Sequence, residues 1–491
     1  MTSARAANRP SFAWLCGDPT FADAILQLRV SYKSDDLPGL PVHRAVLAAH
    51  SEYFKARLLR WERGGCRNAS QCAGACSQSI PHQAMEQPGS SHPPTPFLEE
   101  TFDSQAECDA ARLVVRCMYE GELAEEVKDP LTLARVCRVA ERWAFPSLCS
   151  SCLQRLADLP PSQLPSEQLV LVLQTLPDSC ALLPEHKGWQ KLVLYRILSL
   201  FGDVHAVITN AQLRGYFQQL PFAAVEQWAG SKELTVDSEN SVVELLSLWV
   251  DGPGGRACSH HQRQQLSCLV RVQHLSPAYA LGRLPWVAWF AIPGTSASQV
   301  SYAASYGFGM AGVLSVEQAP PAWSAAPRKK LIPDELRRRN TLNWAVPRQQ
   351  LADLFASKDL PTTLNSKHMY SAGVGWISFL HLMRETQDEL GLRLNCFCQL
   401  ETYAACERLG AMLLHGTPVH LSIARGTRSK AGVAMYDHSQ GIKTCMYDHG
   451  IGTGAFAMKG LRSVADLDPF LLDGCLQIEA ALHVLHRPGQ Q

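Results

Sequence analysis

The sequence predicts a multidomain α+β protein in which regions of different texture follow one another. Residues 12–158 combine a strand-like segment with amphipathic helices, which indicates a small α/β fold. Residues 159–292 carry one helical pattern after another and predict an all-α region. Residues 293–340 have the composition of a linker, and residues 341–486 contain closely spaced β-like runs, typical of a mostly-β sandwich.

Composition limits the class of protein. At ~150 residues per domain, 491 residues suggest about three domains. A hydrophobic fraction of 46% and a charged fraction of 18% are typical of a folded chain with several cores. Lys plus Arg equals Asp plus Glu, at 45 each, so no basic excess favours a nucleic-acid partner.

Cysteine usage and hydropathy indicate a compartment. The N-terminal MTSARAANRPSFAW lacks the apolar core of a signal peptide, and no apolar run reaches the ~18 residues of a membrane span. The 17 cysteines are odd in number and scattered through predicted helices, which favours reduced thiols acting as small core residues. We expect a protein of the nucleus and/or cytoplasm with no membrane partner.

The first predicted elements are a strand and a pair of short helices. Residues 21–33 are expected to form the strand, with Ile25, Leu28 and Val30 apolar between polar neighbours. The helix pair is LPVHRAVLAAHSEYFKARLLRWE, residues 40–62. The residues that predict its helices are Pro41 as an opening residue, Ser51 as an N-cap, and Phe54 and Leu58 four positions apart on one side. Periodicity alone favours an ordinary helical hairpin.

Residues 63–96 are rich in Gly, Ser, Pro, Gln, His and Cys, which predicts an exposed, mostly disordered insertion. Its potential metal ligands are Cys66, Cys72, Cys76, His82 and His92. Their spacing matches neither a paired CxxC arrangement nor a common zinc finger, so a loop without metal is the interpretation.

Three more helices are predicted before residue 158. The first covers residues 108–118 and ends at the glycine of YEGEL, Tyr119 to Leu123. Asp129 as N-cap and Pro130 as first residue open the second. Pro146 opens the third. The CxxC formed by Cys149 and Cys152 has no βαβ context, so core packing is favoured over a thioredoxin-like role.

The order of these residue types resembles the BTB/POZ domain, a self-associating protein-interaction module whose helices sit on a small sheet. The matching positions are Asp23 before the strand, His43, Leu47, Ser51 and Phe54 in the helix pair, and Tyr119 and Gly121 in YEGEL. LARVCRVAERWAFPSLCSSCLQRL is similar to the helical end of such a domain. The resemblance covers residues 12–158.

The next region is predicted to be helical throughout. In DSENSVVELLSLWV, Ser238 can cap a helix whose apolar stripe we interpret as core: Val242, Leu245, Leu246 and Trp249. This stretch, followed by LSCLVRVQHLSPAYAL, resembles the BACK domain that commonly follows BTB.

The linker contains two weak motifs. Gly307, Gly309 and Gly312 spell GxGxxG, but no convincing strand precedes them, so no cofactor is predicted. Two basic clusters follow, Arg328 to Lys330 and Arg337 to Arg339. They fit either a bipartite nuclear-import signal or a solvated linker.

The C-terminal region contains MYDH twice, at Met435 to His438 and at Met446 to His449. One hairpin carrying both copies could present metal ligands, but paired turn residues explain the repeat as well. SAGVGWISFLHL, ARGTRSKAGVAMYDHS and LLDGCLQIEAALHVL resemble the C-terminal β domain of plant light-response (POB-type) BTB–BACK proteins.

No catalytic motif is present: GxSxG, HExxH and the P-loop are all missing from the sequence. We therefore expect a non-catalytic protein with no catalytic residue, no cofactor and no bound metal.

The BTB–BACK resemblance implies a substrate-recognition adaptor of a cullin-3 RING ubiquitin ligase. Its implied partners are a second copy of the chain, a cullin-3-type scaffold and an unidentified protein substrate. The residues placed to contact the cullin are Leu58, Leu59, Trp61 and Glu62. The alternative is a BTB scaffold or transcription-linked regulator without ligase association.

Overall fold

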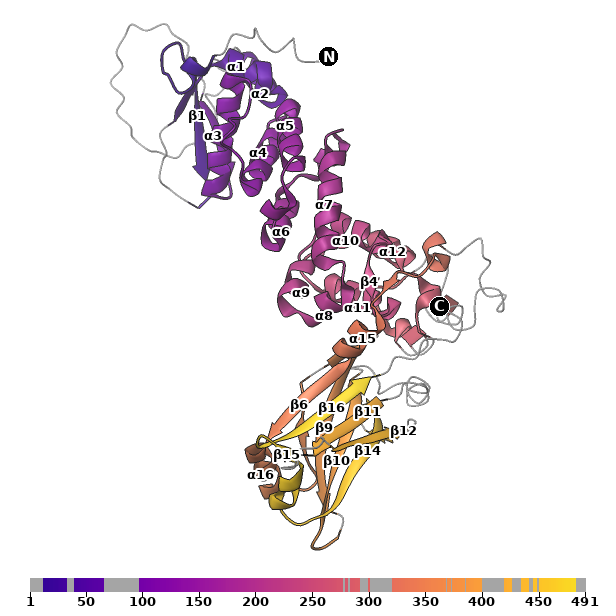
Figure 1. The fold of residues 1–491 in the computed structure, drawn as a ribbon. Coiled ribbons are helices and arrows are strands. Elements are labelled where there is room, and N and C mark those ends of the chain that lie inside the picture. The colour runs from indigo at the N-terminus through magenta and orange to yellow at the C-terminus, as the bar shows by residue number, and fades with distance from the viewer. Residues whose placement is uncertain are drawn as a thin grey trace, which may run out of the picture. The chain divides into compact units, whose positions relative to one another are not determined.

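The structure is a computed structural model of the whole chain. The residues it describes are 12–32, 39–65, 97–276, 279–280, 283–291, 299–300, 320–367, 369–371, 373–384, 386–399, 419–425, 434–440, 445–447 and 450–482. They divide into two compact units, residues 1–196 and 197–491, with the boundary inside one helix. Figure 1 shows helices and sheets along the chain, so the prediction of a mixed α+β protein is confirmed.

The first unit contains a three-stranded sheet in the order β2–β1–β3. Its strands are β1 (Ala24–Val30), β2 (Leu40–Val42) and β3 (Phe97–Phe102). β2 runs antiparallel to β1, whereas β3, which follows a long connection, runs parallel to it.

Alternation along β1 and β3 separates a buried face from an exposed one. Ala24, Leu26, Leu28 and Val30 are buried, whereas Ile25 is 38% exposed. Ile25 therefore lies on the opposite face of the sheet from Leu28 and Val30, since side chains an odd number of positions apart point to opposite faces.

Pro41 was expected to open a helix and instead lies in β2, opposite Ile25. β2 is an edge strand, so a proline, which has no N–H, can lie there without removing a hydrogen bond between strands. The helix begins later, at Arg44.

The helices of this unit begin on the buried face of the sheet and continue away from it (Figure 1). They are α1 (Arg44–His50), α2 (Glu52–Gly65), α3 (Gln105–Glu120), α4 (Pro130–Arg142), α5 (Pro146–Ala157) and α6 (Ser166–Thr175), with short turns η1 (Ala13–Leu15), η2 (Pro161–Gln163) and η3 (Asp178–Leu182). α7 (His186–Phe201) contains the boundary between the units.

The predicted helix ends are confirmed where they depend on local chemistry. Asp129 accepts from the Thr132 amide at 2.8 Å, with Pro130 in the first turn of α4. Gly121 ends α3 with φ +85°, a left-handed conformation that favours glycine. The Ser51 hydroxyl accepts from the Phe54 amide at 3.1 Å, as an N-cap does.

The second unit begins with a helical part. Its elements are α8 (Val204–Thr209), α9 (Ala211–Phe217), α10 (Phe222–Gly230), α11 (Glu239–Asp251), α12 (His260–Leu269), η4 (Val272–His274) and η5 (Leu284–Trp286). The predicted stripe on α11 is buried: Val242, Leu245, Leu246 and Trp249 are each 0% exposed. Ser238 does occupy the N-cap position of α11, but its side chain makes no capping bond.

Residues 320–340 fold against these helices and are not a linker. They contain η7 (Pro321–Ser324), β5 (Lys329–Lys330) and α15 (Pro333–Arg339), and β5 pairs with β4 (Thr235–Val236). The Trp323 side chain is 1% exposed, and its indole nitrogen donates to the Ser267 carbonyl at 3.4 Å. An apparently loose, Ala/Pro-rich segment is therefore fixed by one buried aromatic residue.

Two sheets follow, and their buried residues form one core. One sheet contains β7 (Thr362–Asn365), β8 (Met369–Ser371), β9 (Val374–Arg384), β10 (Leu390–Gln399), β13 (Cys445–Tyr447) and β14 (Gly450–Leu461). The other contains β6 (Thr341–Pro347), β11 (Val419–Arg425), β12 (Ala434–Gln440), β15 (Leu471–Leu472) and β16 (Cys475–Leu482). α16 (Arg348–Ala356) and η9 (Val464–Phe470) add Leu351, Leu354 and Leu467 to the core.

Among the helices of the described ranges, none combines the length and the apolar character that crossing a bilayer requires.

Candidate functional site: interaction surfaces of the two units

His43 and Tyr119, both selected from the sequence, contact each other in the first unit. The Tyr119 hydroxyl accepts from the His43 backbone N–H at 2.8 Å and lies 3.0 Å from the His43 Nδ1. The other ring nitrogen, Nε2, lies 3.2 Å from the Thr20 carbonyl, which can only accept. In the neutral imidazole Nε2 therefore carries the proton, and the Tyr119 hydroxyl donates to Nδ1. Burial raises the pKa of Tyr119 to about 12, which keeps the phenol neutral.

The other selected residues hold the helix pair against its surroundings. A carboxylate oxygen of Asp23 accepts from the Arg44 amide at 2.7 Å, so a residue beside the strand satisfies a free N–H of α1. The Ser51 hydroxyl also donates to the Trp143 carbonyl at 2.5 Å. Phe54, 0% exposed, packs with its ring centroid 5.0 Å from that of Trp143.

Glu100 is a buried charged residue that the sequence reasoning missed. Its side chain is 1% exposed and bonds to two guanidinium groups, those of Arg57 and Arg142. It also accepts from the Tyr53 hydroxyl at 2.6 Å and from the Trp143 indole at 3.3 Å. The sequence feature that could have revealed its burial is the alternation of β3, in which Glu100 falls between Leu98 and Phe102 on the buried face.

The four residues expected to contact a cullin differ in accessibility. Leu58 is 4% exposed and belongs to the core, so it is not available to a partner. Leu59 is 46% exposed, whereas Trp61 is partly buried. Glu62 lies in α2, and its side chain is outside the described residues. Leu59 is therefore the accessible apolar residue of this set.

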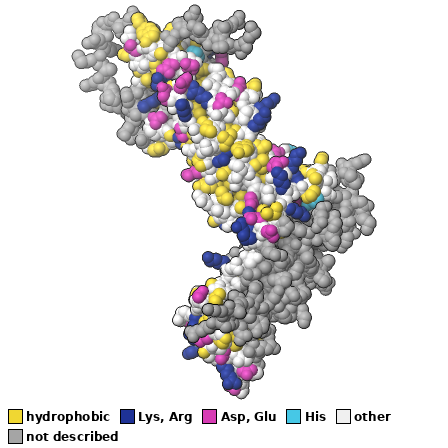
Figure 2. Space-filling view, viewed as in Figure 1, with side chains coloured by type: hydrophobic (Ala, Val, Ile, Leu, Met, Phe, Trp, Pro, Cys, Tyr) yellow, Lys and Arg dark blue, Asp and Glu magenta, His cyan; other side chains and the backbone are white. Residues whose placement is uncertain are grey.

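Other large apolar side chains are exposed at the N-terminal end of this unit. Trp14 is 64% exposed and Phe21 is 77% exposed. Ile25 and Phe97, 38% and 54% exposed, are paired neighbours on the outer face of the sheet. Acidic and basic side chains are interspersed on the face seen in Figure 2. Exposed apolar side chains and mixed charge therefore occur together on this unit.

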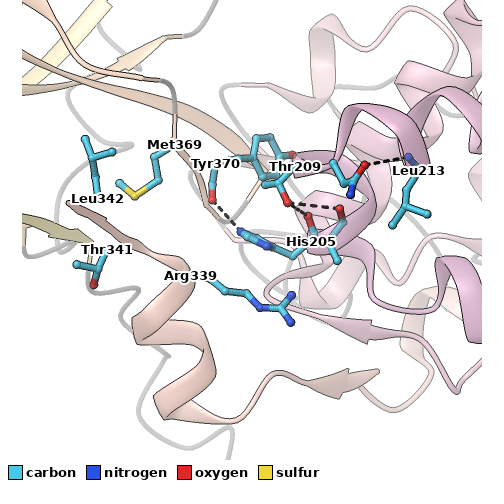
Figure 3. A pocket seen from close by; sticks show the side chains of 10 residues that line it. His205, Thr209, Leu213, Arg339, Thr341, Leu342, Met369 and Tyr370 are labelled. Carbon is cyan, nitrogen blue, oxygen red and sulfur yellow. Dashed lines mark hydrogen bonds between the residues drawn. The ribbon is translucent and has the colours of Figure 1, made fainter. Parts of the chain in front are cut away.

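The second unit contains a cavity of about 480 Å³ (Figure 3). Its lining residues come from the helices and from the first strands of the β part: His205, Ala206, Thr209, Asn210, Leu213, Arg339, Thr341, Leu342, Met369 and Tyr370. The His205 Nε2 donates to the Tyr370 carbonyl at 2.9 Å, which ties α8 to β8.

The charge in this cavity is already balanced. The Arg339 guanidinium bonds to Asp203 at 2.8 Å and to Glu335 at 2.8 Å. The rest of the wall includes the apolar side chains of Leu213, Leu342 and Met369. A cavity with a mostly apolar wall and a few oriented polar groups is suited to an uncharged or apolar side chain.

A second cavity, of about 490 Å³, lies beside the end of α11. Arg256, Arg263 and Arg283 contribute to its wall together with Trp286, which is 47% exposed. Arg283 is neutralised by Glu244 at 2.9 Å, a bond that raises its pKa. Asp251 also lines this cavity, so its charge is mixed.

In the basic segment 328–339, Arg328 is buried, whereas Lys329 and Arg338 form ion pairs at the surface. The Arg328 side chain is 1% exposed, and its Nε lies 3.0 Å from Glu239, which is also buried. Lys329 bonds to Glu233, and Arg338 bonds to Glu335 at 2.8 Å. An import receptor could not bind Arg328 without local unfolding, whereas Lys329, Lys330 and Arg338 are exposed.

The two MYDH copies do not share a hairpin. Asp437 and His438 lie in β12, which pairs with β11, whereas Met446 and Tyr447 lie in β13, which pairs with β14 in the other sheet. Asp448 and His449 lie outside the described residues. Within the described ranges, no three His, Cys, Asp or Glu side chains are placed to hold a metal ion.

Two motifs noted in the sequence lie outside the described residues. These are the glycines of GxGxxG at 307–312 and the Cys and His residues of the insertion at 66–92.

No family model matches the chain, and no curated protein is similar to it. The function must therefore be argued from the chain's own residues.

Proposed function

We propose that this protein is a substrate-recognition adaptor of a cullin-3 RING ubiquitin ligase, with a BTB/POZ-type module followed by a BACK-type helical region. The observation that carries the proposal is the sheet β2–β1–β3 with helices on one face. The residues that resemble BTB positions support it, because His43, Ser51 and Tyr119 make buried contacts between elements.

Self-association of the N-terminal unit is part of this proposal. Trp14, Phe21 and the neighbouring pair Ile25 and Phe97 are exposed apolar side chains that a second copy of the chain would cover. A dimeric adaptor binds a substrate with two sites, so the second contact becomes intramolecular and avidity rises. Light scattering on the purified chain should give the mass of a dimer, and Trp14→Asp should shift it toward the monomer.

The adaptor carries out no bond chemistry itself. It holds the target lysine near the ubiquitin-loaded enzyme, which raises the effective concentration of the reacting groups. Binding of a cullin-3-type scaffold to the α2 surface provides that link, and Leu59 is its apolar anchor in this proposal.

A binding assay with the N-terminal region of cullin-3 tests the scaffold contact. The wild-type chain should be retained, and Leu59→Glu should weaken retention about tenfold or more. Leu171→Glu is the matched control, because Leu171 is 39% exposed on another helix, α6. Failure of the wild-type chain to bind would favour the alternative, a BTB scaffold or transcription-linked regulator without a ligase.

We further propose that a substrate side chain enters the cavity formed by α8, α9, β6 and β8. The apolar wall and its position where helices meet strands support this assignment. Proximity labelling with and without proteasome inhibition should detect proteins that accumulate only with the inhibitor.

The cavity itself is tested by filling it. Leu213→Trp should remove those inhibitor-dependent proteins from the labelled set. Leu472→Trp, at a site 37% exposed in β15, should leave them unchanged. An unchanged set with Leu213→Trp would assign substrate capture to another surface.

A further inference from the structure

Two cysteines from separate elements meet inside the first unit. Cys137 lies on α4 and Cys180 on η3, and their sulfur atoms are 3.5 Å apart. Both are buried, at 0% and 2% exposure, and both are free thiols. The two residues are 43 positions apart in sequence, so the contact depends on the tertiary structure.

The surroundings of the two thiols differ. Cys137 belongs to a regular helix whose buried side packs against α5. Cys180 belongs to a single turn whose other side chains face solvent, with Leu182 88% exposed. The turn is held to α4 by the Ser179 hydroxyl, which donates to Glu141 at 2.8 Å. One such bond can open easily, so Cys180 is the thiol that a small oxidant reaches first.

Electrostatics gives the two thiols different roles. The hydrogen bond between the two thiols lowers the pKa of Cys180. Hydrogen bonding with Cys149 and Cys180, together with burial, raises the pKa of Cys137. Together with the easily opened turn around Cys180, this makes Cys180 the thiol that reacts with the oxidant first and Cys137 the thiol that reacts in the second step.

A disulfide needs a small movement. The S–S bond length is ~2.05 Å, so the sulfurs must approach by about 1.5 Å. The short η3 turn can supply this movement, whereas Cys149, which also neighbours Cys137, is fixed within α5. The geometry favours Cys180 over Cys149 as the partner of Cys137.

We propose that Cys137 and Cys180 form an oxidation site at which a hydroperoxide converts the two thiols into an intramolecular disulfide. The Cys180 sulfur attacks the peroxide, the O–O bond breaks, and a sulfenic acid forms with release of an alcohol or water. The Cys137 sulfur then attacks the Cys180 sulfur, the S–O bond breaks, and water leaves with the proton of Cys137. Two electrons pass from the sulfur pair to the peroxide.

The new bond would attach the connection between α6 and α7 to α4. A cross-link between residues 43 positions apart restricts the unfolded chain, so oxidation should stabilise the first unit. The site is independent of the proposed ligase function.

Tryptic mapping of the full-length protein tests the site. The purified, reduced chain is treated with hydrogen peroxide, alkylated and digested without reductant. Cleavage after Arg and Lys places Cys137 in 136–138, Cys149 and Cys152 in 143–155, and Cys180 in 156–187. Each possible pairing between these peptides therefore has its own mass. We expect 136–138 linked to 156–187, and loss of this species after reduction.

Two cysteine variants and the melting temperature of the oxidised protein provide the controls. Cys180→Ser should abolish the linked species, and Cys149→Ser should retain it. Oxidation should raise the melting temperature of the wild-type chain by about 5 °C or more, reversibly, and leave Cys180→Ser unchanged. Linkage of 136–138 to 143–155, or separate alkylation of Cys137 and Cys180 after oxidation of other thiols, would overturn the proposal.

Discussion

The Tyr119 hydroxyl lies between two groups of His43, 2.8 Å from its backbone nitrogen and 3.0 Å from its Nδ1. Tyr119 is near the end of α3, and His43 is the residue that precedes α1. One phenol therefore satisfies a buried N–H at a helix start and fixes the orientation of a buried imidazole. This contact joins elements 76 positions apart.

Tyr119→Phe removes the phenol oxygen and leaves the His43 N–H buried without that acceptor. We expect the free energy of unfolding of this unit to fall by about 1–3 kcal/mol, the cost of an unsatisfied buried polar group. Hydrogen exchange of the α3 amides in the full chain measures the loss. Tyr195→Phe, at a site 60% exposed, is the matched control and should change it by less than about 0.5 kcal/mol. Equal protection in both variants would contradict this role.

The stability difference between wild type and Tyr119→Phe should depend on alkaline pH. Burial raises the pKa of Tyr119 from 10.0 in the unfolded chain to about 12 in the folded one. The unfolded state therefore loses its proton first, and the contribution of Tyr119 is complete below pH 10 and lost as pH rises to about 12. Chemical unfolding of both proteins across this range should show the two curves converging. A constant difference would indicate that Tyr119 titrates normally.

Glu100→Gln should destabilise the first unit by about 1–3 kcal/mol, because the buried carboxylate loses its charged hydrogen bonds to Arg57 and Arg142, whose half-exposed guanidinium groups remain solvated. The neighbouring residue on β3 gives the control. Glu99 is 42% exposed and bonds to Arg29 at 2.9 Å, so Glu99→Gln should cost ~0–1 kcal/mol. Urea unfolding followed by the Trp143 fluorescence compares the two variants, and similar midpoints would refute the distinction.

Arg328→Ala should destabilise the helical part of the second unit by about 3–5 kcal/mol, since it leaves Glu239 buried without its cation. The guanidinium also donates to the Ala229 carbonyl at 2.7 Å, and that bond would be lost as well. Lys330→Ala, two positions away at an exposed site, should have little effect. Amide hydrogen exchange of α11 measures the stability of this part in both variants, and only Arg328→Ala should lose protection. If Arg328→Ala were as stable as the wild type, residues 328–330 would be a solvated linker.

Helix ends that depend on residues close in the sequence could be predicted from the sequence. The Asp129–Pro130 start of α4, the Gly121 end of α3 and the stripe on α11 are local patterns, and each lies where it was expected. The capping bond of Ser238 could not be predicted in the same way, because the position was right and the hydroxyl found a different neighbour, Ser241.

The partners of strands and of buried charged residues could not be predicted, because they lie far away in the sequence. Ile25 faces outward, and its neighbour there is Phe97, which the parallel pairing of β1 with β3 brings beside it from 72 positions away. Pro41 is as suitable for an edge strand as for a helix start, and the antiparallel pairing with β1 decided between them. The charged surface expected at Arg328 is a buried ion pair for the same reason: its partner, Glu239, is 89 positions away.

The sequence by itself determined the mixed helix and sheet character of the chain, several helix ends and the candidate residues His43, Ser51 and Tyr119, because propensity, capping and periodicity act over a few residues. Only the tertiary structure decided which residues meet: Tyr119 with His43, Glu100 with two arginines, Cys137 with Cys180, and the cavity between helices and strands. These contacts join distant segments, and the burial that gives them their energy exists only after the chain has folded.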